Sequence, residues 1–103
     1  MSNPSLIAAV ELTAATTMNV FGGLTTGAMF NLRFTNRSFA DITLRVGLST
    51  VTGTIQNAGL ICYEQPIPPN GTFEITGLAI GTEYVVARST GSSVSAVAYG
   101  VEL

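Results

Sequence analysis

The sequence has no lysine, no histidine and no tryptophan. Only 10% of its 103 residues are charged, whereas an average soluble domain has about 25%. All four basic residues are arginines, and the formal net charge is −2. Phosphate binding needs clustered cations, so we expect no nucleic-acid partner. So small a net charge gives little self-repulsion, and it favours association with other chains.

The absence of histidine also removes the side chain that most often acts as a general base at neutral pH. The six carboxylates stand singly in the sequence, as Glu11, Asp41, Glu64, Glu74, Glu83 and Glu102. A glycosidase-type pair stays open, because strands can bring distant carboxylates together. Solvated or arginine-paired carboxylates are the simpler interpretation. No His and Cys cluster or acidic loop indicates a zinc or calcium site. We therefore expect no enzymatic activity, no cofactor and no metal site.

The only cysteine, Cys62, cannot form an intrachain disulfide. It lies in LICYEQ, a run in which a cysteine usually packs as a small apolar residue. A catalytic thiol, the alternative, needs a histidine partner. The N-terminal segment lacks the basic region of a secretory signal, and no run approaches the about 20 apolar residues of a membrane span. We expect synthesis in a cytoplasm without export by a signal peptide, and no membrane partner.

Apolar and polar residues alternate with period two from Met29 onward, which predicts β-strands. The strand-like runs, with turns such as PPNG between them, are LIAAVEL (6–12), TMNVF (17–21), MFNLRFTN, DITLRVGLST, LICYEQPI (60–67, ending at Pro66), TFEIT, YVVARS and VSAVAYGVEL. LIAAVELTAA is also compatible with a short helix by propensity. The predicted fold is all-β: one antiparallel β-sandwich or jelly-roll-like domain over 1–103, with seven to eight short strands. Residues 1–21 form an N-terminal strand or arm of it.

The alternation assigns faces to several strands. One shared core is expected from Phe30, Leu32, Phe34, Ile42, Leu44, Val46, Phe73 and Ile75. A hairpin through NRSFA (36–40) is the simplest connection between the runs MFNLRFTN and DITLRVGLST. This hairpin places Arg33 and Arg45 on the polar faces of adjacent strands. That face is either solvated or a docking face whose arginines meet a partner's carboxylates.

The last strand has two apolar faces, one with Val97, Tyr99 and Val101 and the other with small residues. One face must meet the opposite sheet, and a loop or another subunit covers the small-residue face. Phe39 either folds back over the end of the core or anchors in a neighbour's pocket. The candidate interface residues are therefore Arg33, Arg37, Phe39, Arg45, Val94, Ala96 and Ala98. Asn36-Arg37-Ser38 and Asn70-Gly71-Thr72 match the glycosylation pattern, but turn formation explains them better without a secretion signal.

Three stretches between Asn31 and Glu102 carry a family resemblance: NLRFTNRSFADITLRVGLST, PIPPNGTFEITGL and GTEYVVARSTGSSVSAVAYGVE. They resemble the small β-rich virion proteins of tailed bacteriophages, and residues 1–21 match less clearly. The resemblance implies a structural role in the virion, most of all capsid decoration or cement, or a part in the neck or tail. It implies capsid or tail proteins as partners and a symmetric homo-oligomer, with a trimer favoured. A carbohydrate- or receptor-binding module of a tail or fibre is the alternative, and a domain of a cell-surface adhesin is a third.

Overall fold

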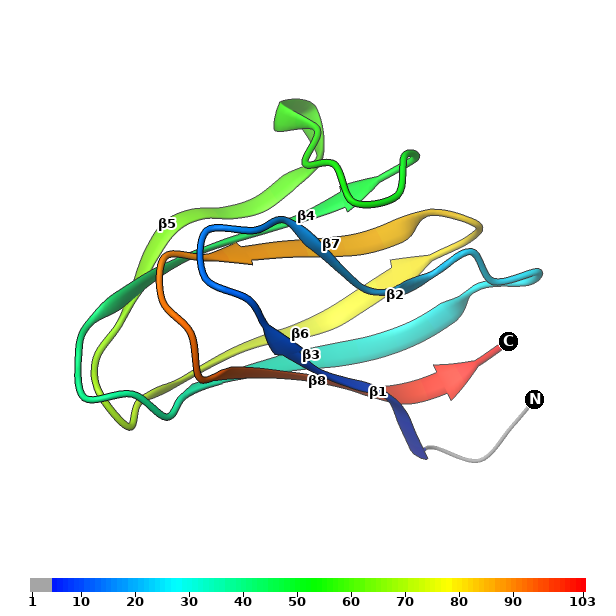
Figure 1. The fold of residues 1–103 in the computed structure, drawn as a ribbon. Helices are drawn as coiled ribbons and strands as arrows, with labels where there is room; N and C mark the ends of the chain where they lie inside the picture. Colours follow the sequence, from blue (N-terminus) through cyan, green and yellow to red (C-terminus); the bar gives the residue numbers. More distant parts are fainter. Residues whose placement is uncertain (1–4) are drawn as a thin grey trace.

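The computed structural model describes residues 5–103, which form eight strands and one short 3-10 helix (Figure 1). The elements are β1 (Ser5–Leu12), β2 (Met18–Gly22), β3 (Ala28–Asn36), β4 (Ile42–Ser49), η1 (Asn57–Gly59), β5 (Leu60–Ile67), β6 (Thr72–Ile80), β7 (Tyr84–Ser89) and β8 (Val94–Glu102). The run that was compatible with a helix is therefore strand β1. The first four residues of the expected N-terminal segment lie outside the described part of the chain.

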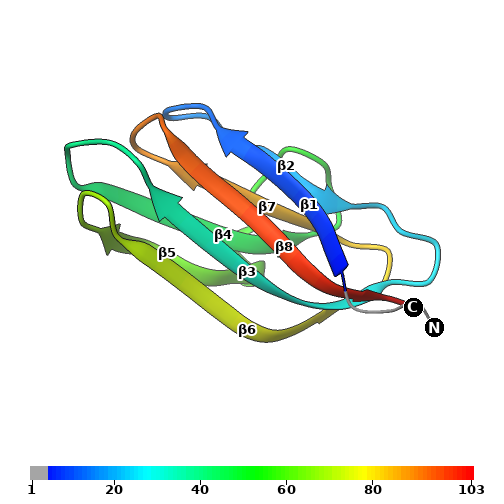
Figure 2. The ribbon, with the colours of Figure 1, turned by 90° about the horizontal axis from the view of Figure 1, so that it is seen from below.

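The strands form two antiparallel sheets of four, with the orders β1-β8-β3-β6 and β2-β7-β4-β5. The two sheets lie face to face as two layers (Figures 1 and 2). The first four strands pair with the last four, as β1 with β8, β2 with β7, β3 with β6 and β4 with β5. A long two-stranded ribbon rolled up in this way is a jelly roll. The predicted fold class is confirmed.

The predicted hairpin between β3 and β4 is wrong. These strands belong to different sheets, so the segment 37–41 crosses from one layer to the other. Each strand has one strongly apolar face, and the two faces meet across the core instead of lying side by side. Arg33 of β3 and Arg45 of β4 consequently lie on the outer faces of opposite sheets, and they do not share a surface.

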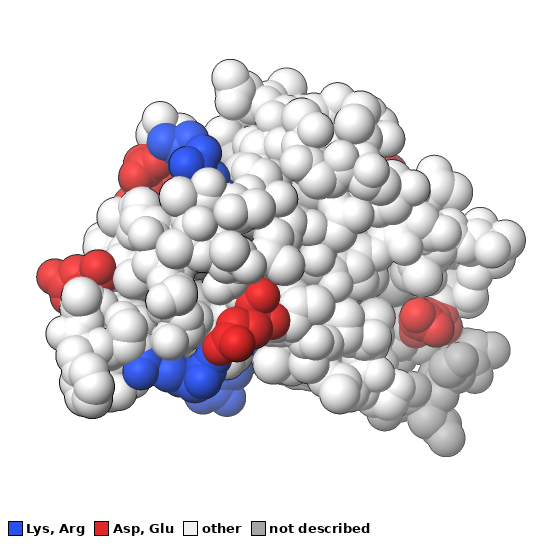
Figure 3. All heavy atoms as spheres, in the orientation of Figure 1, with Lys and Arg blue, Asp and Glu red and all other residues white. Residues whose placement is uncertain are grey.

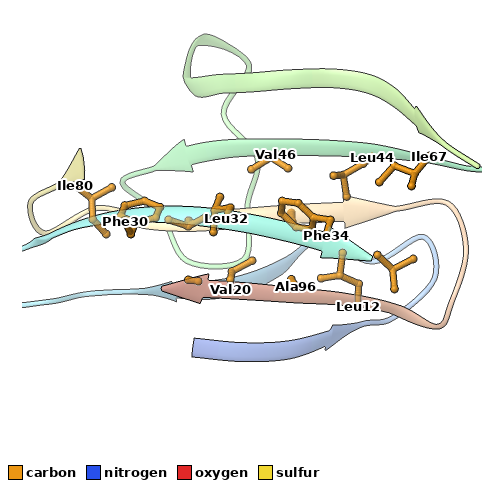
Figure 4. Packing of buried hydrophobic residues seen from close by; sticks show 14 of the residues in the cluster. Leu12, Val20, Phe30, Leu32, Phe34, Leu44, Val46, Ile67, Ile80 and Ala96 are labelled. Carbon is orange, nitrogen blue, oxygen red and sulfur yellow. The ribbon is translucent and has the colours of Figure 1, made fainter. Parts of the chain in front are cut away.

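The core lies between the sheets (Figure 4). Six of the eight predicted core residues are at most 3% exposed: Phe30, Leu32, Phe34, Ile42, Leu44 and Val46. The other two, Phe73 and Ile75, are partly buried and pack against this cluster from the edge strand β6. The rings of Phe21 and Phe30 join the two sheets edge to face, with their centroids 4.8 Å apart.

The small-residue face of β8 is also part of this core. Val94, Ala96 and Ala98 are fully buried within the chain, so the expectation that they form a subunit interface is wrong. The strand register supplies the reason, because Ala96 lies opposite Phe34 and Ala98 opposite Leu32 of β3. Small residues beside large ones fill the space between the sheets without overlap.

The outer face of β8 therefore carries the larger residues. Val97, Tyr99 and Val101 are partly exposed there, on the side that points away from the second sheet. The sequence alone could not assign the two faces of this strand, because both are apolar. Any contact of β8 with another subunit must use this outer face.

Replacing a core leucine tests the packing. We expect Leu44→Ala to lower the free energy of unfolding by about 2–5 kcal/mol, since the fully buried side chain leaves a cavity. Chemical denaturation measures the loss. Val51→Ala, at a position 49% exposed, is the control and should change stability by no more than about 0.5 kcal/mol. Equal losses from the two variants would contradict the core assignment.

Candidate functional site

Four connections gather at one end of the sandwich, namely 13–17, 37–41, 68–71 and 90–93 (Figure 1). Backbone hydrogen bonds fasten these connections to their neighbours. The Ala15 N–H donates to the Ser89 carbonyl at 2.8 Å, and the Arg37 N–H donates to the Ser93 carbonyl at 2.9 Å. This loop end is thus a connected structure, and it holds two of the predicted interface residues, Arg37 and Phe39.

Asn36 organises the loop end from a fully buried position at the end of β3. Its Nδ2 donates to the carbonyls of Ala40 (2.9 Å), Ile67 (3.1 Å) and Pro68 (3.2 Å). Its Oδ1 accepts hydrogen bonds from the backbone N–H and the hydroxyl of Ser38, at 3.0 and 2.7 Å. An amide enclosed in this way is not accessible for glycosylation, and the interpretation of this motif as turn chemistry is confirmed.

The turn PPNG has the expected form as well. The Gly71 N–H donates to the Pro68 carbonyl at 2.9 Å, and Asn70 has a positive φ of 60°, a conformation that asparagine tolerates better than most residues. The backbone N–H of Asn36 donates to the Gly71 carbonyl at 2.9 Å. This turn therefore supports the end of β3.

Phe39 stands free of the rest of the chain. Its side chain is 96% exposed, so the alternative in which it folds back over the core is wrong. The residues on either side are fixed, because Ser38 bonds to Asn36 and the Ala40 carbonyl accepts hydrogen bonds from Asn36 and Ser38. The loop therefore presents an apolar ring to solvent from an ordered backbone.

Arg37, in the same loop, is directed toward its own chain. Its guanidinium forms an ion pair with Glu11 of β1, and its Nε donates to the Ser95 hydroxyl of β8 at 2.8 Å. Both partners of the ion pair are largely exposed, so the pair contributes little to stability. It holds the β3–β4 connection against the edge of the first sheet.

The outer face of the β1-β8-β3-β6 sheet carries a group of partly or fully exposed apolar side chains. The register places Leu6 opposite Tyr99 and Met29 opposite Val101. Leu6 and Met29 are 63% and 58% exposed. We call this surface the apolar outer face, and its residues are Leu6, Ala9, Met29, Ala79, Val97, Tyr99 and Val101.

Arg33 lies on this face and is exposed. The register sets it between Glu74 of β6 and Val97 of β8. The Tyr99 hydroxyl donates to Glu74 Oε2 at 2.6 Å, and this hydrogen bond is the main reason why the pKa of Tyr99 is raised. Arg33 and Glu74 are therefore neighbouring charged residues of this face. The edge-on view in Figure 3 shows charged groups scattered among a large majority of uncharged ones.

Arg45 occupies a different environment on the outer face of the other sheet. Its Nε donates to Glu64 of β5, and its guanidinium lies 4.7 Å from the centroid of the Tyr63 ring. Glu64 also accepts from the Thr43 hydroxyl at 3.1 Å. The hydrogen bond from Arg45 is the main cause that lowers the pKa of Glu64, and the positive charge of Arg88 adds to it.

Sequence reasoning missed these partners of Arg45. The strand pairing is irregular between Leu44 and Val46, so Tyr63 and Glu64 together oppose Arg45 in a β-bulge. Glu64 has a positive φ of 55°. Glycine or asparagine usually signals such a conformation in a sequence, and neither residue occupies this position. The motif at Asn36 did carry a signal in the sequence, because it was assigned to a turn. The buried contacts of the Asn36 side chain could not be predicted, because they depend on the fold.

Within residues 5–103, no group of three or more His, Cys, Asp and Glu residues is placed to hold a metal ion. The same part of the chain contains no helix of the length and apolar character that crossing a membrane requires. Comparison of the chain with family models, curated proteins and solved structures gives no match.

Removing the Asn36 side chain should loosen the loop end. We expect Asn36→Ala to cost about 1–3 kcal/mol in the free energy of unfolding, because buried carbonyls lose their donor. It should also speed hydrogen exchange in residues 37–41. Thr35→Ala, one residue earlier on the outer face, is the control. Unchanged exchange in this loop would show that Asn36 does not order it.

Cys62 provides a test of burial. It packs partly against the core, as expected for a small apolar residue, and burial raises the pKa of its thiol. Because only the thiolate reacts, we expect Ellman's reagent to modify Cys62 in the folded protein several times more slowly than N-acetylcysteine at mildly alkaline pH. Unfolding in guanidinium should remove the difference. Equal rates before unfolding would mean that the thiol is freely accessible.

Proposed function

We propose that this chain is a non-enzymatic structural protein of a tailed-phage virion, which binds capsid or tail subunits and also itself, with capsid decoration as its role. The resemblance of residues 31–102 to small virion proteins motivates this proposal. The jelly-roll fold is compatible with it, because viral capsid proteins often use this fold. Lectins and cupins use it too, so the fold by itself does not decide the function.

The observation that carries the proposal is Phe39. An exposed phenylalanine is unfavourable in water, and a loop that is already ordered loses little entropy when a partner binds it. Large aromatic side chains that enter a partner's pocket dominate the binding energy of many interfaces. The hydrogen bonds of Asn36 and Ser38 hold the backbone on both sides of Phe39 in position, so the loop end suits attachment to another protein.

The apolar outer face supports self-association. It offers exposed Leu6 and Met29 beside Tyr99, with Arg33 and Glu74 as the charged residues near its centre. A stable interface needs about 800 Å² from each partner, and obligate interfaces are more apolar than the remaining surface. The expected homo-oligomer, a trimer, can use this face together with the loop end.

The low charge fits a protein that acts in many copies. Because only 10% of the residues are charged, electrostatic attraction adds little to the affinity of each single contact. Attachment of an oligomer to a repeating lattice makes the second and later contacts intramolecular, so modest individual contacts are sufficient.

The experiment is to purify particles of the phage that encodes the chain and to measure binding of added protein to particles that lack it. We expect the protein to be a component of the particle, and Phe39→Ser to weaken binding by about tenfold or more. Val51→Ser, which replaces another exposed apolar residue in the β4–β5 connection, is the matched control.

Light scattering at micromolar concentration tests self-association on the same samples. Absence of the protein from particles would refute the virion role. If Phe39→Ser and Val51→Ser bound equally well, the loop end would not be the attachment site. Binding of the protein to host cells instead of particles would favour the receptor-binding alternative.

A further inference from the structure

A shallow cleft lies on the outer face of the β2-β7-β4-β5 sheet, beside the loop end and on the opposite side of the sandwich from the apolar outer face. Its lining residues come from three neighbouring strands and one loop, and they are Thr43, Arg45, Glu64, Arg88 and Thr90. The cleft thus holds two of the chain's four arginines.

The sheet register holds these two arginines together. Arg45 of the central strand β4 lies directly opposite Arg88 of its neighbour β7. Like charges at directly opposed positions repel one another. Without a negative charge between them, this arrangement is unfavourable for the folded state. The question is therefore which anions balance the pair.

Glu64 supplies one negative charge. The bulge in β5 turns Glu64 and Tyr63 toward Arg45, and Glu64 adopts a left-handed backbone conformation with φ of 55° to do so. Residues other than glycine rarely adopt this conformation. The carboxylate bonds to the Nε of Arg45 and to the Thr43 hydroxyl.

These contacts hold the Nε edge of Arg45 in place but leave its Nη groups without a partner in the described part of the chain. Its Nε edge is occupied by Glu64 and one face of its guanidinium by the Tyr63 ring. Among residues 5–103, no ion pair involves Arg88, and no side-chain hydrogen bond is made by it or by the Nη groups of Arg45. Two guanidinium groups face one carboxylate, so the cleft carries an excess of one positive charge.

We propose that this cleft binds the carboxylate of an aspartate or glutamate side chain from a partner protein. Arg88 and the free Nη edge of Arg45 are its donors, with the Thr90 hydroxyl beside them. A guanidinium fork matches the two oxygens of a carboxylate, and one carboxylate neutralises the excess charge. This inference does not rest on the virion role, because it uses neither Phe39 nor the apolar outer face.

Two other anions fit the site less well. A phosphate dianion brings more charge than the cleft has in excess. An acidic sugar must also seat its bulky ring, and Arg45 already covers the face of the Tyr63 ring that is next to the cleft. A side-chain carboxylate needs only the guanidinium donors, which the cleft provides.

Sodium propionate, which has the same carboxylate as a glutamate side chain, is the probe. We expect it to produce a saturable shift of the Arg88 Nε–Hε signal in NMR spectra at constant ionic strength, with affinity in the millimolar range. Inorganic phosphate and glucuronate should bind more weakly. Arg88→Gln should abolish the accompanying shift of the Arg45 Nε–Hε signal, whereas Arg33→Gln, at an arginine of the opposite sheet, should leave both shifts unchanged.

Thermal unfolding gives a second readout. Propionate should raise the Tm of the native protein and of Arg33→Gln, but not of Arg88→Gln. In the absence of propionate, Arg88→Gln should be at least as stable as the native protein, because the repulsion is gone. A purely structural Arg88 would instead make this variant less stable.

Three results would overturn the proposal. The first is a shift that does not saturate or that affects Arg33 equally, which would show only general screening of charge. The second is tighter binding of glucuronate, which would point to an acidic sugar. The third is tighter binding of phosphate, which would make the cleft a phosphate site. Neither the presence nor the absence of the protein in virions affects these outcomes.

Discussion

The structure depends on the hydrogen bonds of a single buried amide, that of Asn36. In this fold the connections β3–β4 and β5–β6 both cross from one sheet to the other. Asn36 donates to Ala40 in the first connection and to Ile67 and Pro68 at the start of the second. One side chain therefore ties together the two crossings and bonds to both neighbours of Phe39 in the loop. Because a buried polar group without partners is costly, the arrangement forms as a unit.

The sequence predicted the strands and most of the core because alternation is a local property. Phe34 and Leu44 were assigned to buried faces correctly from their neighbours in sequence alone. Alternation does not say which strands lie side by side, however, and the β3–β4 connection was therefore taken for a hairpin. The two faces of β8 could not be separated either, since the choice depends on the opposed Phe34 and Leu32 in another strand.

The candidate sites were predictable only as single residues. Phe39 was recognisable as an aromatic in a polar loop, but its exposure depends on where the loop crosses the end of the sandwich. Arg45 was chosen with Arg33, although its true neighbours are Arg88 and Glu64. These neighbours follow from the register of three strands and from a backbone bulge, which no local pattern in the sequence encodes.

The bulge in β5 also has a consequence for how crowded copies behave. β5 is an edge strand, and a regular free edge can recruit further extended chains and grow into fibrils. Here Pro66 lacks an N–H, and the Tyr63–Glu64 bulge interrupts the spacing of the other backbone groups. A foreign strand that pairs along this edge therefore forms fewer ladder hydrogen bonds. For a chain with so little charge to keep its copies apart, the irregular β5 edge reduces the risk that this edge starts amyloid-like aggregation.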